Sequence, residues 1–127
     1  MRRSNNLNNM RFKEFIHMDF TKSNNKYMKK ISKEMADCFQ KSITKKKSNT
    51  QVTVGVYYTN LILFDNTIAT LDNSSREITI SNCGYFTQTT KDRLNAIEGV
   101  SITQKRGVWH LNGQEWNGES KVIRCGN

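Results

Sequence analysis

The spacing of apolar residues changes near Gln51, and this change limits the architectures open to the chain. Before Gln51 the apolar residues recur every three or four positions, which is typical of an amphipathic helix. After it they alternate with polar residues, as Val52, Val54 and Val56 do, which is typical of strands with one buried face. A helical segment followed by a β-rich body predicts an α+β protein.

The expected helix covers residues 24–43, with Ser23 or Asn24 as its N-cap. At about 100° per residue, its apolar side chains fall on one half of the surface and its lysines on the other. Glu34 and Asp37 interrupt the basic half, so an ordinary solvent face with ion pairs explains it as well as a binding surface does. The lysines of this half that are candidate binding residues are Lys26, Lys29, Lys30 and Lys33.

The body after Gln51 has the pattern of a small antiparallel sheet with one inserted helix. A second helix is expected within 87–99, with a threonine at its N-cap and Gly99 at its end. The expected order is β-β-β-α-β-β-β, with the basic amphipathic helix packed on the sheet. Strands are expected within 52–64 (a run through 52–58, with Asn60 as a break), 67–71, 77–81, 100–104, 108–111 and 121–124.

The charge of the chain divides at the same place as its hydrophobic pattern. Residues 1–50 contain 13 Lys and Arg and 4 Asp and Glu, so they carry the whole net charge of +9, whereas residues 51–127 contain seven of each. We expect residues 1–22 to form a basic, partly disordered arm and residues 23–127 to form a single α+β domain. Within that domain, residues 44–50 are expected to be a basic linker between the helix and the sheet body.

This charge distribution makes nucleic acid, or a host complex that contains nucleic acid, the expected partner. Segregated positive charge attracts polyanions and gains affinity by releasing their counterions. A hairpin tip projects into solvent, which favours Lys105 and Arg106 as further contacts. Outside the helix, the candidate binding residues are Arg2, Arg3, Lys45, Lys46, Lys47, Lys105 and Arg106.

Aromatic residues of the body lie near cations in the sequence, which is a pattern of proteins that stack single-stranded nucleic acid. The alternative is that at least one of the two tryptophans packs the core, because a small core needs its largest side chains. The aromatic residues concerned are Tyr57, Tyr85, Trp109 and Trp116, near Lys91, Arg93, Lys105 and Arg106.

No catalytic or metal-binding motif is found in the sequence. Pairing Cys83 with His110 as nucleophile and base is poorly supported, because a cysteine at a strand end is usually a packed residue. The three cysteines form an odd set without a C-x-x-C pair, and no apolar run reaches membrane-spanning length. We therefore expect a reduced, intracellular protein without enzyme activity, cofactor, metal site or membrane partner.

Short motifs of the body occur together in a pattern that is similar to a known family. They are Tyr58-Thr59, Gly84-Tyr85, Thr87, Thr89-Thr90-Lys91-Asp92-Arg93-Leu94-Asn95, Gly99-Val100, Gln104-Lys105-Arg106-Gly107-Val108-Trp109 and Trp116-Asn117-Gly118. With these motifs, residues 51–124 resemble a family of small uncharacterised tailed-phage proteins. The resemblance implies phage origin, an α+β body and an accessory role in the cytoplasm of the infected bacterium. It also implies that Thr89 caps the helix and that Arg93 pairs locally, and it carries no activity over to any residue.

The function that these features favour is that of a non-enzymatic phage accessory protein that binds nucleic acid, or a nucleic-acid-bound host complex, through residues 1–50. The alternative is a protein-interaction module that inhibits a host defence or replication enzyme, docking on an acidic surface through the lysine-rich helix and the segment with Phe12, Phe15 and Phe20. A third reading is a virion component whose basic arm neutralises packaged DNA. The exposed edges of a small sheet also allow a homodimer.

Overall fold

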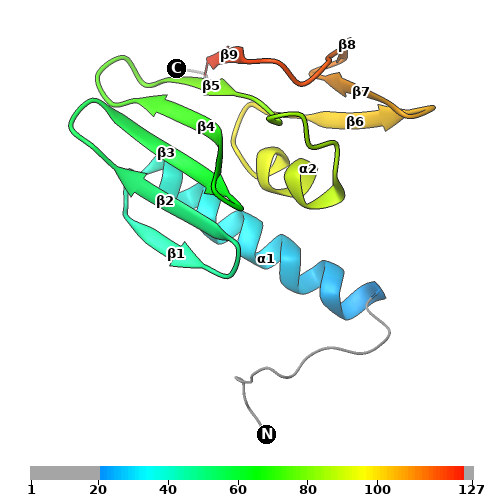
Figure 1. The fold of residues 1–127 in the computed structure, drawn as a ribbon, viewed down its shortest axis with the longest axis horizontal. Coiled ribbons are helices and arrows are strands. Elements are labelled where there is room, and N and C mark those ends of the chain that lie inside the picture. Colours follow the sequence, from blue (N-terminus) through cyan, green and yellow to red (C-terminus); the bar gives the residue numbers. More distant parts are fainter. Residues whose placement is uncertain (1–20, 125–127) are drawn as a thin grey trace, which may run out of the picture.

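The structure is a computed structural model that describes residues 21–124, with side chains over residues 29–123. Within this range the chain folds into two α-helices and nine β-strands in two antiparallel sheets (Figure 1), which confirms the predicted α+β class. The helices are α1 (Thr21–Gln40) and α2 (Gln88–Asn95). The strands are β1 (Lys45–Lys47), β2 (Thr50–Val54), β3 (Tyr58–Leu63), β4 (Asn66–Asp72), β5 (Glu77–Ile80), β6 (Ile102–Lys105), β7 (Val108–Leu111), β8 (Gln114–Glu115) and β9 (Lys121–Arg124).

The strands form two sheets where the sequence predicts one. Strands β1 to β5 follow one another as antiparallel neighbours, and β9 returns to pair with β5, which completes a six-stranded sheet. Strands β6, β7 and β8 form a separate three-stranded sheet. Tight turns with positive φ angles at Arg106, Gly107, Asn112 and Gly113 make these three strands pair with one another instead of extending the large sheet.

The hydrophobic core lies between α1 and one face of the large sheet and continues past α2 to the small sheet. Helix α2 lies beside α1 towards the small sheet (Figure 1). Ile31, Met35 and Phe39 of α1 are buried at the three- and four-residue spacing of one helix face. On β3, Leu61 and Leu63 are buried while the residues between and before them are less so, as expected for alternating side chains. The predicted packing of an amphipathic helix on the sheet is therefore confirmed.

The N-terminal boundary of α1 differs from the predicted one. The predicted helix covers residues 24–43, whereas α1 runs from Thr21 to Gln40. Ser23 and Asn24 lie inside the helix, so neither is its N-cap. Serine and asparagine favour N-caps in general, but the helix already begins at Thr21.

The C-terminal end of α1 is closed by a Schellman motif that the sequence does not reveal. Ser42 takes a positive φ of 55°. Its N–H donates to the carbonyl of Phe39 at 3.3 Å, and the N–H of Ile43 donates to the carbonyl of Cys38 at 2.8 Å. This motif usually has glycine at the left-handed position. Because Ser42 stands there, the sequence carries no usual signal that the helix ends before Ile43.

The predicted basic linker at 44–50 is also wrong, because these residues form a β-hairpin with β2. Strand β1 pairs with β2 from Lys45 opposite Val52 to Lys47 opposite Thr50. Ser48 has a φ of 58°, which lets the chain reverse within two residues. Lysine is a poor strand former, but at the open edge of a sheet each lysine side chain reaches water, so three in a row are tolerated.

A turn interrupts the run of alternating residues that predicts a strand through 52–58. The N–H of Gly55 donates to the carbonyl of Tyr58 at 2.8 Å, and Asn73 Nδ2 donates to the carbonyl of Gly55 at 3.0 Å. Strand β2 therefore ends at Val54, and β3 begins at Tyr58. The turn leaves Val56 85% exposed and Tyr57 75% exposed.

Candidate nucleic-acid interface

The exposed face of α1 carries three of the predicted binding residues. Lys29, Lys30 and Lys33 are exposed, while Ile31 and Met35 on the opposite side of the helix are buried. Lys29 and Lys33 are one helical turn apart, so their side chains lie on the same side of α1. The predicted contacts that lie outside the described side chains are Arg2, Arg3 and Lys26.

Lys29 and Lys33 line an open groove of about 630 Å³ between α1 and α2. Lys91 of α2 lines the same groove, so three primary amines are brought together from two helices. Among the described lining residues the one carboxylate is that of Asp92, and Gln88 Nε2 donates to its Oδ1 at 2.8 Å. The lining residues thus give the groove a net positive charge, with polar amides beside it.

Lys91 is held at the rim of this groove by two interactions with the small sheet. Its Nζ donates to Gln104 Oε1 of β6 at 2.8 Å. The same amino group lies 5.8 Å from the ring centroid of Trp109 on β7, within the range of a cation–π interaction. Because both contacts leave other N–H donors of the ammonium group available, Lys91 can still bind an anion.

Arg93, on the buried side of α2, fixes the two walls of the groove relative to each other. Its Nη1 donates to Ser32 Oγ of α1 at 2.7 Å, its Nε to Thr50 Oγ1 of β2 at 2.7 Å, and its Nη2 to Asn49 Oδ1 at 3.0 Å. Burial lowers the pKa of Arg93, and the charge of Asp92 opposes this shift. An arginine side chain stays protonated even so. These three partners are distant in sequence, whereas the family resemblance implies a local pairing.

The first turn of α2 is capped two residues earlier than the resemblance implies. Thr87 has an extended backbone, and its Oγ1 accepts a hydrogen bond from the N–H of Thr90 at 3.2 Å. Thr89 lies inside the helix and is not the cap. A threonine N-cap followed by a short helix agrees with the sequence pattern, which did not settle which threonine it was.

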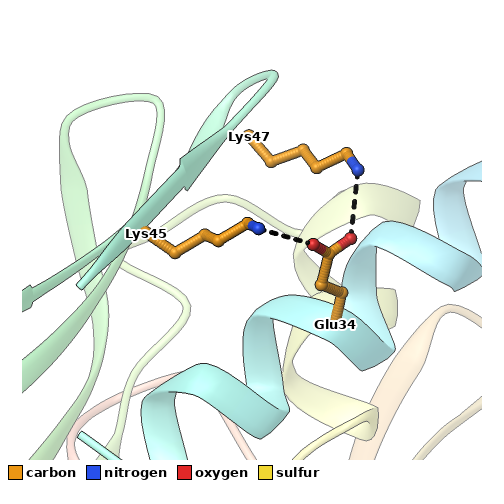
Figure 2. Close-up of polar contacts among 3 residues, drawn as sticks. All are labelled: Glu34, Lys45 and Lys47. Atoms are coloured by element: carbon orange, nitrogen blue, oxygen red, sulfur yellow. Dashed lines mark hydrogen bonds and ion pairs between the residues drawn. The ribbon is translucent and has the colours of Figure 1, made fainter. Parts of the chain in front are cut away.

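The β1 lysines are engaged in ion pairs with α1. Lys45 Nζ lies 3.0 Å from Glu34 Oε2, and Lys47 Nζ lies 3.1 Å from Glu34 Oε1, so one carboxylate bridges two lysines (Figure 2). Hydrogen bonds from Lys45 and Lys47 lower the pKa of Glu34, and the bond to Glu34 raises the pKa of Lys45. Lys46 lies between them in the strand and therefore points to the other face of the sheet. Two of the three predicted contacts on β1 are thus partly neutralised.

Lys105 and Arg106 occupy the exposed tip of the β6–β7 hairpin, as the sequence predicts. Arg106 has a φ of 54° and the following Gly107 a φ of 81°, which is the backbone of a tight hairpin turn. Neither Lys105 nor Arg106 lines the groove between α1 and α2. The structure therefore separates the predicted contacts into an α1 set, a β1 set and a hairpin-tip set.

The tryptophans do not form a stacking surface. Trp109 and Trp116 are both buried, with ring centroids 6.3 Å apart, and Phe86 packs edge-on against Trp109 at 5.0 Å. This confirms the alternative that they pack the core. Tyr57 and Tyr85 are exposed and remain available to a ligand.

Lys91 belongs to the groove but was not among the predicted binding residues. The sequence places it beside aromatic residues, yet nothing local indicates that α2 lies against Lys29 and Lys33. The only available signal was the spacing of Lys29 and Lys33 on one side of their helix. A contact between segments about sixty residues apart depends on the buried Arg93, which the sequence does not identify as buried.

Two further findings concern ligands and membranes. No helix in the stretch from Thr21 to Arg124 is long and apolar enough to cross a membrane. Among the side chains that the structure describes, no group of three or more His, Cys, Asp or Glu is placed to hold a metal ion.

These features define a small α+β protein with cations gathered at a groove between α1 and α2. The profile of the Kyanoviridae Gp96 protein family matches residues 28–123, and the chain belongs to this family of phage proteins. No curated protein and no solved structure matches the chain significantly. The matched range begins before Lys29, so it includes the exposed lysines of α1, which lie outside the residues 51–124 that carry the sequence resemblance.

Proposed function

We propose that this protein is a non-enzymatic phage accessory protein that binds nucleic acid in the cytoplasm of the infected bacterium. The observation that carries the proposal is the meeting of Lys29, Lys33 and Lys91 in one groove. Ammonium groups from two helices, fixed relative to each other by Arg93, suit successive phosphates of one strand. The basic residues that precede α1 in the sequence add further positive charge.

The expected binding is electrostatic and falls steeply with salt. Each phosphate neutralised by a lysine releases condensed counterions, so the logarithm of the affinity falls in proportion to the logarithm of the salt concentration. The hydrogen bond from Gln88 to Asp92 occupies one oxygen of the only described carboxylate in the groove, which reduces its competition for the lysines. Sequence-specific contacts are not required for this mode of binding.

The test is fluorescence anisotropy with labelled single- and double-stranded DNA and RNA over a range of salt concentrations. The variant combines Lys29→Gln, Lys33→Gln and Lys91→Gln. We expect it to lose about tenfold or more in affinity at low salt and to lower the salt slope on single strands by about two.

The matched control combines Lys41→Gln, Lys45→Gln and Lys47→Gln, which removes the same charge from lysines paired with Asp37 or Glu34. This variant is expected to lose much less affinity than the groove variant. Equal losses would mean that net charge alone drives binding, and the absence of binding to any of the four polymers at low salt would refute the proposal.

A second candidate function is a protein-interaction module that inhibits a host defence or replication enzyme. The observation that favours it is the β2–β3 turn, where the consecutive residues Val56, Tyr57 and Tyr58 expose large apolar side chains. Capture of one host protein from nuclease-treated lysate, lost on changing Val56 and Tyr57 to Ser, would support this function. Capture that persists in this variant would exclude the turn as the docking surface.

A further inference from the structure

A second hollow, smaller and more enclosed than the basic groove, lies where the β3–β4 turn meets the first turn of α2. Its volume is about 280 Å³, and its walls come mainly from Leu63, Phe64, Ile68 and Tyr85. Thr87 and Thr90 of α2 complete one side, and none of the described lining residues is charged. An uncharged and mostly apolar group is therefore the occupant that these walls fit.

Asn82 lines this hollow, and its side-chain amide carries a buried hydrogen-bond donor. The residue is 1% exposed, and its Oδ1 accepts from the N–H of Gly84 at 2.8 Å, which fixes the orientation of the side-chain amide. Its Nδ2 is buried, and among the residues that the structure describes it has no hydrogen-bond partner. The amide also packs closely on Gly118, where a β-carbon would collide with it. Buried donors normally have a partner, and an acceptor on a ligand would supply one.

Phe64 presents an exposed ring at the mouth of the hollow from a strained backbone. It has a φ of 48°, and the following Asp65 has a φ of 67°, both in the left-handed region. A bulky residue is rare there, and strain of this kind is found most often at functional sites. Phe64 is 64% exposed and Tyr85 is 54% exposed, although both line the hollow. Two partly exposed aromatic rings thus line an uncharged cavity.

We propose that this hollow binds a single unpaired nucleobase, an inference that rests on the proposed nucleic-acid function. A base is planar and uncharged, and a ring carbonyl, as in thymine or uracil, would accept from Asn82 Nδ2. Phe64 and Tyr85 supply the stacking surface that single-strand binders use. The hollow and the groove share the first turns of α2, since Thr87 lines one and Lys91, four residues later, lines the other. The occupant is therefore a single strand, with phosphates on the lysines and one base in the hollow.

The first experiment compares the affinity of the full-length protein for oligothymidylate with its affinity for an abasic strand of the same length. Both strands have the same phosphates, so only the bases differ. The expected ratio of affinities is about ten, from the stacking of one base. If the two affinities are equal and the groove variant still weakens binding, the nucleobase proposal would be overturned. The proposed function would remain intact.

Variants of the lining residues test whether this ratio of affinities depends on the hollow. Asn82→Asp keeps an acceptor for the N–H of Gly84 but replaces the donor with a second acceptor, so the ratio should fall to about one. If that variant does not fold, Phe64→Ala tests the same point at an exposed position and should also reduce the ratio. Val56→Ala is the matched control, an exposed apolar residue outside the hollow, and should leave the ratio unchanged. A ratio that survives both Asn82→Asp and Phe64→Ala would overturn the proposal.

The second experiment does not depend on phosphate binding. Nuclear magnetic resonance follows the side-chain amide of Asn82 and the rings of Phe64 and Tyr85 while thymidine is added to the protein. Shifts of these signals are expected, and their absence would overturn the proposal even if strands bind to the groove. Shifts produced by N-acetylphenylalaninamide but not by thymidine would also overturn it and would assign the hollow to a protein side chain. If neither strand binds but thymidine still shifts these signals, nucleic-acid binding in the groove would be rejected. Nucleobase binding in the hollow would be retained.

Discussion

Arg93 on α2 donates a hydrogen bond from Nη1 to Ser32 Oγ on α1 at 2.7 Å, although the two residues are 61 positions apart. The same buried guanidinium also reaches the hairpin between β1 and β2 through Asn49 and Thr50. One side chain therefore joins both helices and the large sheet. The position of Lys91 relative to Lys29 and Lys33, and with it the groove, depends on this contact.

Replacing Arg93 with Ala should lower the free energy of unfolding by about 3 kcal/mol, because the hydrogen bonds of its buried, charged guanidinium to α1 and to the β1–β2 hairpin are lost. Urea denaturation measures this loss. Arg106→Ala removes the same charge from an exposed hairpin tip and should change stability by no more than about 0.5 kcal/mol. Arg93→Lys should recover only part of the loss, since an ammonium group cannot reproduce the guanidinium fork. Similar losses of unfolding free energy for Arg93→Ala and Arg106→Ala would contradict the assignment of Arg93 as the link between α1, α2 and the large sheet.

The N-cap of α2 is tested by a pair of neighbouring threonines. Thr87→Ala should cost about 1 kcal/mol, because the N–H of Thr90 loses its acceptor. Thr89→Ala should have a much smaller effect, since alanine is a good helix former. Thermal unfolding of the two variants separates these outcomes, and a larger loss at Thr89 would show that the cap is assigned to the wrong residue.

Two glycines with nearly the same backbone conformation should respond differently to alanine. Gly118 has a φ of 91° and Gly113 a φ of 89°. A β-carbon at Gly118 would collide with the side-chain amide of Asn82, whereas a β-carbon at Gly113 would meet nothing within 4 Å. Gly113→Ala should cost about 1–2 kcal/mol from backbone strain alone, and Gly118→Ala should cost clearly more. Chemical denaturation measures the difference, and equal costs would mean that the contact with Asn82 relaxes freely.

The Glu34 ion pairs predict a pH dependence of stability. Because the pKa of Glu34 is lowered in the folded protein, its contribution is present above the usual pKa of 4.5 and is lost as the pH falls through the lowered value. Glu34→Gln should therefore be slightly less stable than the unmodified protein at neutral pH. At a pH where Glu34 is protonated, the two proteins should have the same stability.

Urea midpoints for both proteins, measured over this pH range and at low and high salt, provide the test. The difference at neutral pH should shrink at high salt, since both ion pairs are partly exposed. A difference that persists at acid pH would exclude the carboxylate as its cause.

Local patterns in the sequence predicted the α+β class, the amphipathic α1 and the threonine-capped helix α2, because each depends on residues close together in the chain. The patterns failed where one residue type stood in for the usual one. Ser42 ends α1 in a conformation that glycine usually takes, and Lys45–Lys47 form a strand that only an edge position tolerates. A linker was predicted at 44–50 because its run of lysines was interpreted as a solvent-exposed segment without regular structure.

The candidate site was predicted only in part for a different reason. The exposed lysines of α1 follow from helix periodicity, but Lys91 joins them through contacts between distant segments. The orphaned amide of Asn82 and the left-handed backbone of Phe64 likewise depend on how loops pack, which no spacing of residues in this sequence reveals. Periodicity identifies which face of a helix is exposed, whereas the partner across a groove is set by tertiary packing.

The return of β9 to the edge of β5 has a consequence for the order in which the protein is built. Glu77 pairs with Arg124, so the large sheet lacks its sixth strand until residue 124 has left the ribosome. During synthesis α1 and strands β1 to β5 can assemble first, while the outer edge of β5 stays unpaired and able to accept another chain. The three-stranded sheet, whose pairings are all local, can form during this interval. Completion of the large sheet therefore follows the synthesis of every other described strand.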